Sequence, residues 1–312
     1  MAAEPQGFAR VTQTQEDTGL MSPKRHRAIR AGKSVPLAAA IIAIGVSAVA
    51  IGAVQRRAAR TIPAQHAGSV TAKCKRGLTP VAGGFAAPGF TPTADTGPVF
   101  RFASKPAGKR GIKAAAFNFS DDPHELDSYA YCAKRAHPLR IKAKRVRLFP
   151  GSFGSAVARC PRGRQAVGGG FKTDNFTLTQ GAPIFTFTSK RAGKRGWKAA
   201  GLNVGSPGGG NPSGRLTAYA YCQKGRPKVR VRSKTVTAPP LSIRNVDVKC
   251  PHRRKALSGG FNGHYGISGG GLRVAAAITS KRGARARAWH TAALGLSSPN
   301  PARITAYVYC GR

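Results

Sequence analysis

Apolar and polar residues alternate in short runs through most of the chain that follows residue 60. Lys228–Arg232 reads KVRVR and Leu216–Tyr221 reads LTAYAY, and glycines and prolines separate runs of this kind. A period of two predicts β-strands, because successive side chains of a strand point to opposite faces of the sheet. No segment beyond residue 60 has the spacing of an amphipathic helix, so we expect an all-β fold.

The same order of landmarks is written three times beyond residue 70. Each copy has a cysteine, a Gly-Gly-Phe step, a Ser-Lys pair, an apolar anchor and a closing Tyr-x-Tyr-Cys. Such regular repetition indicates three structural units, which we place at 70–135, 136–224 and 225–312. The steps end at Phe85, Phe171 and Phe261; the Ser-Lys pairs begin at Ser104, Ser189 and Ser280; the anchors are Ile112, Trp197 and Trp289; the tyrosine pairs are Tyr129 and Tyr131, Tyr219 and Tyr221, and Tyr307 and Tyr309.

Each unit of about 85 to 90 residues is large enough to bury a core of its own, especially when it is cross-linked. We therefore expect three tandem β-sandwich-like repeats. The first is expected to be truncated, because residues 55–69 form a linker and an apolar segment lies directly before it. The alternative is one pseudo-threefold β-prism, in which each copy supplies one sheet to a shared core. In both arrangements the Gly-Gly-Phe steps permit close backbone approach and supply a core ring.

All six cysteines of the chain belong to the repeated pattern, two in each copy. Zinc sites usually show Cys-x-x-Cys pairs or a histidine at fixed spacing, and the copies share neither. An even number of regularly spaced cysteines predicts disulfides and an oxidising compartment. Other connectivities stay open, and the expected pairs lie within each copy: Cys74 with Cys132, Cys160 with Cys222, and Cys250 with Cys310.

Residues 34–54 form a run of 21 residues without a charge, long enough to cross a hydrocarbon core of about 30 Å as a helix. More bases precede this run than follow it, which favours a cytoplasmic N-terminus and an extracellular C-terminal part. We expect a single-pass signal anchor behind a disordered tail at 1–33. A cleaved signal peptide, with Ala48-Val49-Ala50 at the cleavage site, is the alternative and would yield a secreted protein. The start at Met1 or Met21 stays open.

The pattern Cys-Pro-x-Gly, Gly-Gly-Gly-Phe, Trp, Asn203 and Ala-Tyr-Ala-Tyr-Cys is clearest in copy two. It resembles repeat units of uncharacterised secreted or membrane-anchored proteins of high-GC bacteria, a group with no assigned activity. The resemblance covers residues 70–312 and implies export and repetition. Copy one lacks the proline and the tryptophan, and copy three has Gly295 in place of the asparagine. Similarity to the vitelline outer-layer type of β-prism is limited to threefold repetition, with no shared motif.

Positive charge is the other dominant feature of the chain. It has 52 lysines and arginines against 10 acids, and such a field attracts polyanions over about 8 Å at physiological salt. We expect anionic polymers of the cell envelope or matrix as partners, bound by a basic edge on each unit; a role in solubility alone is the alternative. The candidate polyanion-binding residues are Arg140, Lys142, Lys144, Arg145, Arg147, Lys190, Arg191, Lys194, Arg195, Lys228, Arg230, Arg232, Lys281, Arg282, Arg285 and Arg287.

The aromatic landmarks admit two interpretations. Core packing is favoured, because Ile112 replaces the tryptophan in copy one and an apolar substitute preserves packing. The alternative is a lectin-like module that stacks a neutral sugar on Trp197 and Trp289. Extracellular DNA is a further possible partner, bound non-specifically through its phosphates, because the chain carries no nucleic-acid recognition motif.

An enzyme is the least favoured class. Copies two and three contain two acids, Asp174 and Asp247, which are too few for paired catalytic carboxylates. Residues 266–270 match the Gly-x-Ser-x-Gly string of a nucleophile elbow, but no acid follows Asp247, so a glycine-rich loop is expected. The acidic cluster at 121–127 offers Ca²⁺ ligands, yet it is not repeated, and we expect a solvated loop and no metal or other cofactor. The sequence thus predicts a non-enzymatic, membrane-tethered repeat protein that binds anionic polymers.

Overall fold

The structure is a computed structural model in which residues 47–312 form one compact unit. The predicted tail at 1–33, Met21 and the apolar run up to residue 52 lie outside the described residues. Among the residues that are described, no helix is long and apolar enough to cross a membrane. The described ranges are 53–89, 99–134, 139–174, 184–205, 213–225, 227–264, 266–268, 271–284, 286–296 and 300–311.

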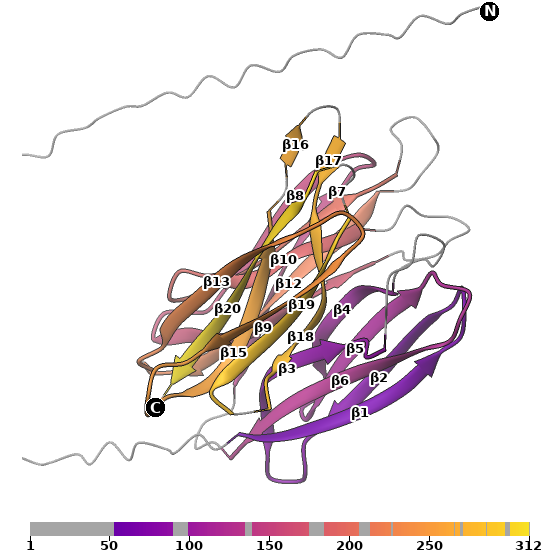
Figure 1. Cartoon of the computed structure of the whole chain (residues 1–312). Coiled ribbons are helices and arrows are strands. Elements are labelled where there is room, and N and C mark those ends of the chain that lie inside the picture. Colours follow the sequence, from indigo (N-terminus) through magenta and orange to yellow (C-terminus); the bar gives the residue numbers. More distant parts are fainter. Residues whose placement is uncertain are drawn as a thin grey trace, which may run out of the picture. The chain divides into compact units, whose positions relative to one another are not determined.

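The all-β prediction is confirmed: the described chain forms three six-stranded antiparallel sheets and one short hairpin (Figure 1). Sheet A has the strand order β1 (Val54–Ile62), β6 (His124–Ala133), β3 (Thr79–Ala86), β18 (Ala275–Arg282), β19 (Ala288–Gly295) and β14 (Ile243–Lys249). Sheet B has β2 (Ala67–Lys73), β5 (Gly111–Asn118), β4 (Val99–Ala107), β9 (Arg164–Thr173), β12 (Gly214–Lys224) and β7 (Arg140–Leu148). Sheet C has β13 (Arg230–Ala238), β20 (Ala302–Gly311), β15 (Lys255–Gly263), β10 (Ile184–Ala192), β11 (Gly196–Asn203) and β8 (Phe153–Arg159), and β16 (Gly266–Ser268) pairs with β17 (Gly271–Arg273).

Every sheet is shared between two repeats. Repeat 1 supplies three strands to sheet A and three to sheet B, repeat 2 divides its strands between sheets B and C, and repeat 3 divides its strands between sheets C and A. The expected β-sandwich-like repeats are therefore confirmed only as all-β and disulfide-linked, because no repeat has a sheet of its own. The pseudo-threefold alternative describes the shared core correctly, except that each repeat contributes half of two sheets.

The first repeat contains the same six strands as the second. The residues predicted as a linker, 55–69, form most of β1 and the beginning of β2. Strand β1 pairs with β6 along its whole length, from Val54 opposite Cys132 to Ile62 opposite His124. The truncated end unit expected from the sequence is thus complete, because its first strand begins where the apolar run ends.

Three phenylalanines meet at the centre of the body. The rings of Phe85, Phe171 and Phe261 contact one another edge to face, with centroids 6.1 Å apart in all three pairs. Each ring comes from the Gly-Gly-Phe step of a different repeat, so one hydrophobic contact joins all three copies. Edge-to-face pairs of this kind add about 0.5–1.5 kcal/mol beyond the burial of their area.

The Gly-Gly-Phe steps also make the joints, which are the places where strands of two repeats meet within a sheet. Ser280 pairs with Phe85 in sheet A, Ser104 with Phe171 in sheet B, and Ser189 with Phe261 in sheet C. The second glycine of each step lies directly against the serine carbonyl of the neighbouring repeat, and a Cβ there would overlap it. Glycine is needed at these positions because two backbones approach closely.

The first glycine of each step makes room for the apolar anchor of its own repeat. An added Cβ at Gly169 would overlap Trp197, and one at Gly259 would overlap Trp289. In sheets C and A the indole N–H of the anchor then donates to a joint serine, from Trp197 to Ser189 at 3.0 Å. The motif residues therefore form one connected assembly inside the body.

The second tyrosine of each Tyr-x-Tyr pair closes a joint. The Tyr131 hydroxyl accepts a hydrogen bond from the backbone N–H of Arg282, at 2.5 Å, in the next repeat around the ring. Tyr309 accepts one from Arg191 at 2.7 Å. The third tyrosine, Tyr221, has a buried hydroxyl without a partner.

The three expected disulfides are confirmed: Cys74–Cys132, Cys160–Cys222 and Cys250–Cys310. In each repeat the first cysteine follows the last residue of an edge strand and the second lies in an inner strand of another sheet. Each bridge therefore ties two sheets together. In the chain-entropy model a loop of this length stabilises the fold by roughly 4 kcal/mol.

Candidate polyanion-binding surface

The two tryptophans and the second tyrosine of each Tyr-x-Tyr pair belong to the interior. Trp197 and Trp289 are each 1% exposed, and Tyr131, Tyr221 and Tyr309 are at most 2% exposed. The core interpretation of these residues is confirmed. A covered ring has no free face for a ligand, so Trp197 and Trp289 are excluded as the stacking platform of a lectin-like site.

The Ser-Lys segments lie in the middle of the sheets and not on a free edge, which corrects the predicted basic edge. Lys190 and Lys281 are half-buried on the outer faces of sheets C and A. Each ammonium lies 5.3 Å from the centroid of a tyrosine ring in the next repeat, Tyr307 for Lys190 and Tyr129 for Lys281. These cation–π contacts hold the joints together and leave the lysines only partly available to a ligand.

The arginines that follow these lysines are less available still. Arg282 is 9% exposed, and its guanidinium lies over the Tyr131 ring at 4.4 Å. Arg191 donates to the Gln165 side chain at 3.1 Å and to the Lys194 carbonyl at 2.9 Å. Burial lowers the pKa of both arginines. Arg191 and Arg282 therefore serve the joints.

The remaining candidates on β7 and β13 are exposed. Both are edge strands that pair on one side only, β7 with β12 and β13 with β20. Charge on an edge prevents pairing with another sheet, and it also presents a basic strip to an anionic chain. The exposed bases are Arg140, Lys142, Lys144, Arg145 and Arg147 on β7, with Lys228, Arg230 and Arg232 at β13.

Bases that are far apart in the sequence meet at one end of the body, which we call the disulfide end because β6, β12 and β20 finish there beside the three bridges. Lys194, Arg195 and Arg287 of the predicted set lie in its turns, and Arg285 lies outside the described residues. None of the described residues in these turns is acidic. Further exposed bases there are Lys73, Lys75, Arg76, Lys109, Arg110, Arg159, Arg162, Lys224, Lys249, Arg253 and Lys255.

A small basic pocket of about 390 Å³ lies in this end beside the Cys160–Cys222 bridge. Arg164, Lys194 and Arg195 line it together with two glycines. The Arg195 guanidinium is fixed by two hydrogen bonds to the Cys160 carbonyl, at 3.0 Å from Nε and 2.7 Å from Nη2. Cationic side chains that are already fixed around a pocket favour the binding of an anionic group, because less side-chain entropy is lost on binding.

Most acids of the described chain lie away from the disulfide end. Asp121 and Asp122 belong to the β5–β6 connection at the opposite end, and Glu125 lies near the start of β6. Arg57 on β1 forms ion pairs with Glu125 and Asp127, so part of the acidic cluster neutralises a base. Within the described residues no group of three or more histidine, cysteine or acidic side chains is placed to hold a metal ion. Because most acids lie away from the basic disulfide end, the charge of the body is polarised along the strands.

Two sheet faces carry lysines directly opposite each other. Lys105 pairs with Lys113 on sheet B, and Lys190 pairs with Lys198 on sheet C. Like charges in this position destabilise a sheet. Burial, followed by the charges of Lys172 and Lys113, lowers the pKa of Lys105. An anion bound across such a pair would relieve the repulsion.

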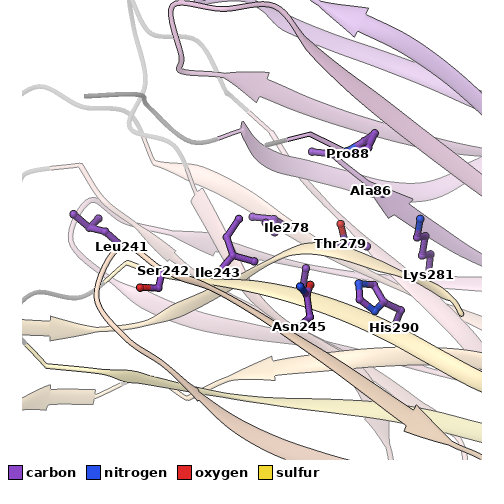
Figure 2. A pocket seen from close by; sticks show the side chains of 12 residues that line it. Ala86, Pro88, Leu241, Ser242, Ile243, Asn245, Ile278, Thr279, Lys281 and His290 are labelled. Carbon is purple, nitrogen blue, oxygen red and sulfur yellow. The ribbon is translucent and has the colours of Figure 1, made fainter. Parts of the chain in front are cut away.

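The outer face of sheet A is different. It has a groove of about 640 Å³ between the end of β3 and the edge strand β14 (Figure 2). Asn245 and His290 line one wall and face Thr279 and Lys281, with Leu241 at the far end (Figure 2). The sequence did not indicate this groove, because residues 86–88 of repeat 1 complete a lining that otherwise comes from separate strands of repeat 3.

The hydrolase string belongs to a hairpin and not to a nucleophile elbow. Gly266–Ser268 forms β16, which pairs with β17 at Gly271–Arg273. An elbow requires a strand followed by a helix. The glycine-rich turn expected from the sequence is thus a β-hairpin.

No protein-family model matches this chain, and no curated protein matches it either.

Proposed function

We propose that the protein is an exported, membrane-tethered, non-enzymatic repeat protein whose basic surface binds anionic polymers of the cell envelope or matrix. The observation that carries the proposal is the disulfide end, where exposed lysines and arginines of all three repeats gather in turns without a described acid. Polyanion binding of this kind is driven largely by the release of counterions.

The edge strands and the sheet faces extend this surface. The bases of β7 run from the disulfide end along the edge of sheet B, and the Lys105–Lys113 pair lies on the face of the same sheet. A polymer that follows these positions would contact several cations in turn, which increases avidity without a deep pocket.

The proposed tether adjoins the body directly in the chain. The uncharged run 34–54 ends at Val54, which is also the first residue of β1 and pairs with Cys132. A chain anchored by this run would stay close to the membrane, so anionic polymers attached near the membrane surface are the expected ligands.

The test compares two variants of residues 47–312, the compact unit, that change charge equally. Arg76→Glu/Arg162→Glu alters exposed turns of the disulfide end, whereas the control Arg215→Glu/Arg303→Glu alters exposed positions near the opposite end. Binding to polyphosphate, a polyuronate and DNA would be measured across a salt series. We expect the first variant to lower the slope of log K against log salt by about one per lost contact, and the control to change it little.

Equal losses in the two variants would show that net charge, and not the disulfide end, governs binding. Binding that is independent of salt and confined to a neutral glycan would overturn the proposal and favour a lectin-like function.

A further inference from the structure

The groove on sheet A has chemistry that the other two sheets lack. In sheet A, Asp247 lies opposite His290, which lies opposite Lys281. The corresponding row is Val157, Lys198 and Lys190 in sheet C, and Thr71, Lys113 and Lys105 in sheet B. The pseudo-threefold fold therefore supplies two internal controls, in which the same backbone carries lysine pairs instead.

The side chains of Asn245, His290 and Lys281 are exposed or partly exposed in the groove, whereas Thr279 is 7% exposed. The Asn245 side chain is exposed, and no hydrogen bond to it is found in the described part of the chain. The His290 ring is oriented by Asp247, whose carboxylate oxygen lies 3.1 Å from Nδ1. The Lys281 ammonium has a hydrogen bond to Tyr129 at 3.3 Å, which leaves further donors.

Leu241 closes the opposite end of the groove in a conformation that leucine disfavours. Its φ is 49°, in the left-handed region, and its side chain is 54% exposed. The same turn has Gly151 with φ 70° in repeat 2 and Gln65 with φ 55° in repeat 1. Glycine adopts this conformation freely, whereas a leucine there costs about 1 kcal/mol and buries little surface. The backbone conformation therefore does not explain a leucine at position 241, whereas a role in lining the groove does.

The lining changes along the groove from apolar to cationic. Leu241 and Ile243 lie at one end, Asn245 and Thr279 in the middle, and Lys281 beside His290 at the other (Figure 2). A volume of about 640 Å³ falls within the range of small-molecule sites. The matching ligand has an apolar face, hydroxyl groups at its rim and one carboxylate.

We propose that the sheet A groove binds a carboxylated sugar residue of an anionic polysaccharide. The C–H face of the sugar packs on Leu241 and Ile243, its hydroxyls bond to Asn245 and Thr279, and its carboxylate lies between Lys281 and His290. The inference rests on the proposed function and deepens it, because it assigns one polymer class to a specific site on sheet A. Polyphosphate and DNA have charge without the matching hydroxylated ring.

The experiment measures binding of residues 47–312 to oligogalacturonate, to the neutral galactose oligomer and to polyphosphate, each across a salt series. Wild type should prefer oligogalacturonate, with part of the affinity remaining at high salt. Asn245→Ala and Leu241→Gly should each weaken this binding by about tenfold, the scale of one lost contact, and leave polyphosphate binding unchanged. Leu241→Gly should be at least as thermally stable as wild type. Lys190→Met, which removes the base at the position of sheet C that corresponds to Lys281, should retain the preference for oligogalacturonate.

Each other outcome decides against one of the two proposals. If both groove variants bind oligogalacturonate as wild type does, the groove is not the site, while salt-dependent binding to all polyanions would still support the proposed function. If the neutral oligomer binds equally well, the carboxylate requirement is wrong. If no polyanion binds to wild type, the proposed function fails as well.

Discussion

The joints of sheets A and C and the joint of sheet B share one backbone design and differ in how it is completed. In sheets A and C a buried tyrosine accepts a hydrogen bond from an arginine N–H, and a tryptophan packs on its ring at about 5.5 Å. In sheet B the position of the arginine is Pro106, which has no N–H, and the position of the tryptophan is Ile112. Tyr221 is therefore buried like the other two tyrosines, but its hydroxyl lacks the hydrogen bond from a backbone N–H.

This difference shows what the repeated signature encodes. The cysteines, Gly-Gly-Phe steps, anchors and tyrosines all serve contacts within or between repeats, and Pro106 and Ile112 of copy one fall in the same joint. The signature specifies how three copies close into one body. Function is then expected on the outside of the body, at the disulfide end and, where the copies differ, in the sheet A groove.

The largest contrast between the joints should appear when the anchors are truncated. Trp289→Ala and Trp197→Ala should each lower the free energy of unfolding by about 3–5 kcal/mol, because each leaves a large cavity and an unpaired serine. Ile112→Ala should cost less, about 2–4 kcal/mol, since it removes fewer atoms and no hydrogen bond. Denaturant unfolding followed by circular dichroism measures both. Equal losses at all three joints would contradict the proposed difference.

Removing the tyrosine hydroxyls should separate the joints more cleanly. Tyr131→Phe and Tyr309→Phe leave the buried N–H groups of Arg282 and Arg191 without an acceptor, which should cost about 1–3 kcal/mol each. Tyr221→Phe removes a hydroxyl that has no partner, so it should be neutral or stabilising. Midpoints of urea unfolding report the order. A loss at Tyr221→Phe as large as the other two would mean that its hydroxyl is satisfied in solution.

Alkaline pH should destabilise all three joints through the same residues. Burial raises the pKa of Tyr131, Tyr221 and Tyr309 well above the usual value near 10. The folded state then retains its protons while the unfolded state loses them. The free energy of unfolding is therefore at its full value below pH 10. It falls as pH rises further, by about 1.4 kcal/mol per pH unit for each tyrosine.

The arginine contacts partly oppose this effect at Tyr131 and Tyr309, and nothing comparable opposes it at Tyr221. Tyr221→Phe should therefore become more stable than wild type above pH 10, even if the two are equal at pH 7. The measurement is the thermal midpoint as a function of pH. An unchanged alkaline slope in this variant would show that Tyr221 already ionises freely.

Much of the fold was predictable from local patterns. Alternating residues such as those of Leu216–Tyr221 lie in a strand, and the expected cysteine pairs are the observed ones. The partner of each strand was not predictable. Ser104 is opposite Phe171 of another repeat, but the same letters occur in all three copies, so the pattern does not tell whether a strand pairs within its copy or with the next.

The positive charge of the candidate surface was predictable, but the location of its basic side chains in the fold was not. Edge-strand bases such as Lys142 and Lys144 are exposed as expected, because an alternating run at a free edge has no strand to cover it. Arg282 is buried because a neighbouring repeat supplies the tyrosine that covers it. The disulfide end and the sheet A groove are formed by residues distant in the chain, and short sequence motifs do not report such neighbours.

The smallest expected effect tests whether Pro106 is the reason that the joint of sheet B differs from the other two. Pro106→Ala restores an N–H opposite Tyr221, which should raise the free energy of unfolding by about 1 kcal/mol. The same change increases the conformational entropy of the unfolded chain, which should lower the free energy of unfolding by about 0.4–1 kcal/mol. The two nearly cancel, so the single variant should stay within about 0.5 kcal/mol of wild type. The coupling appears only in a double-mutant cycle: with alanine at 106, Tyr221→Phe should now cost about 1 kcal/mol more than it does beside proline. A cycle that closes without coupling would mean that proline is not the reason the Tyr221 hydroxyl lacks a partner, and that the strands of sheet B are set further apart at this joint.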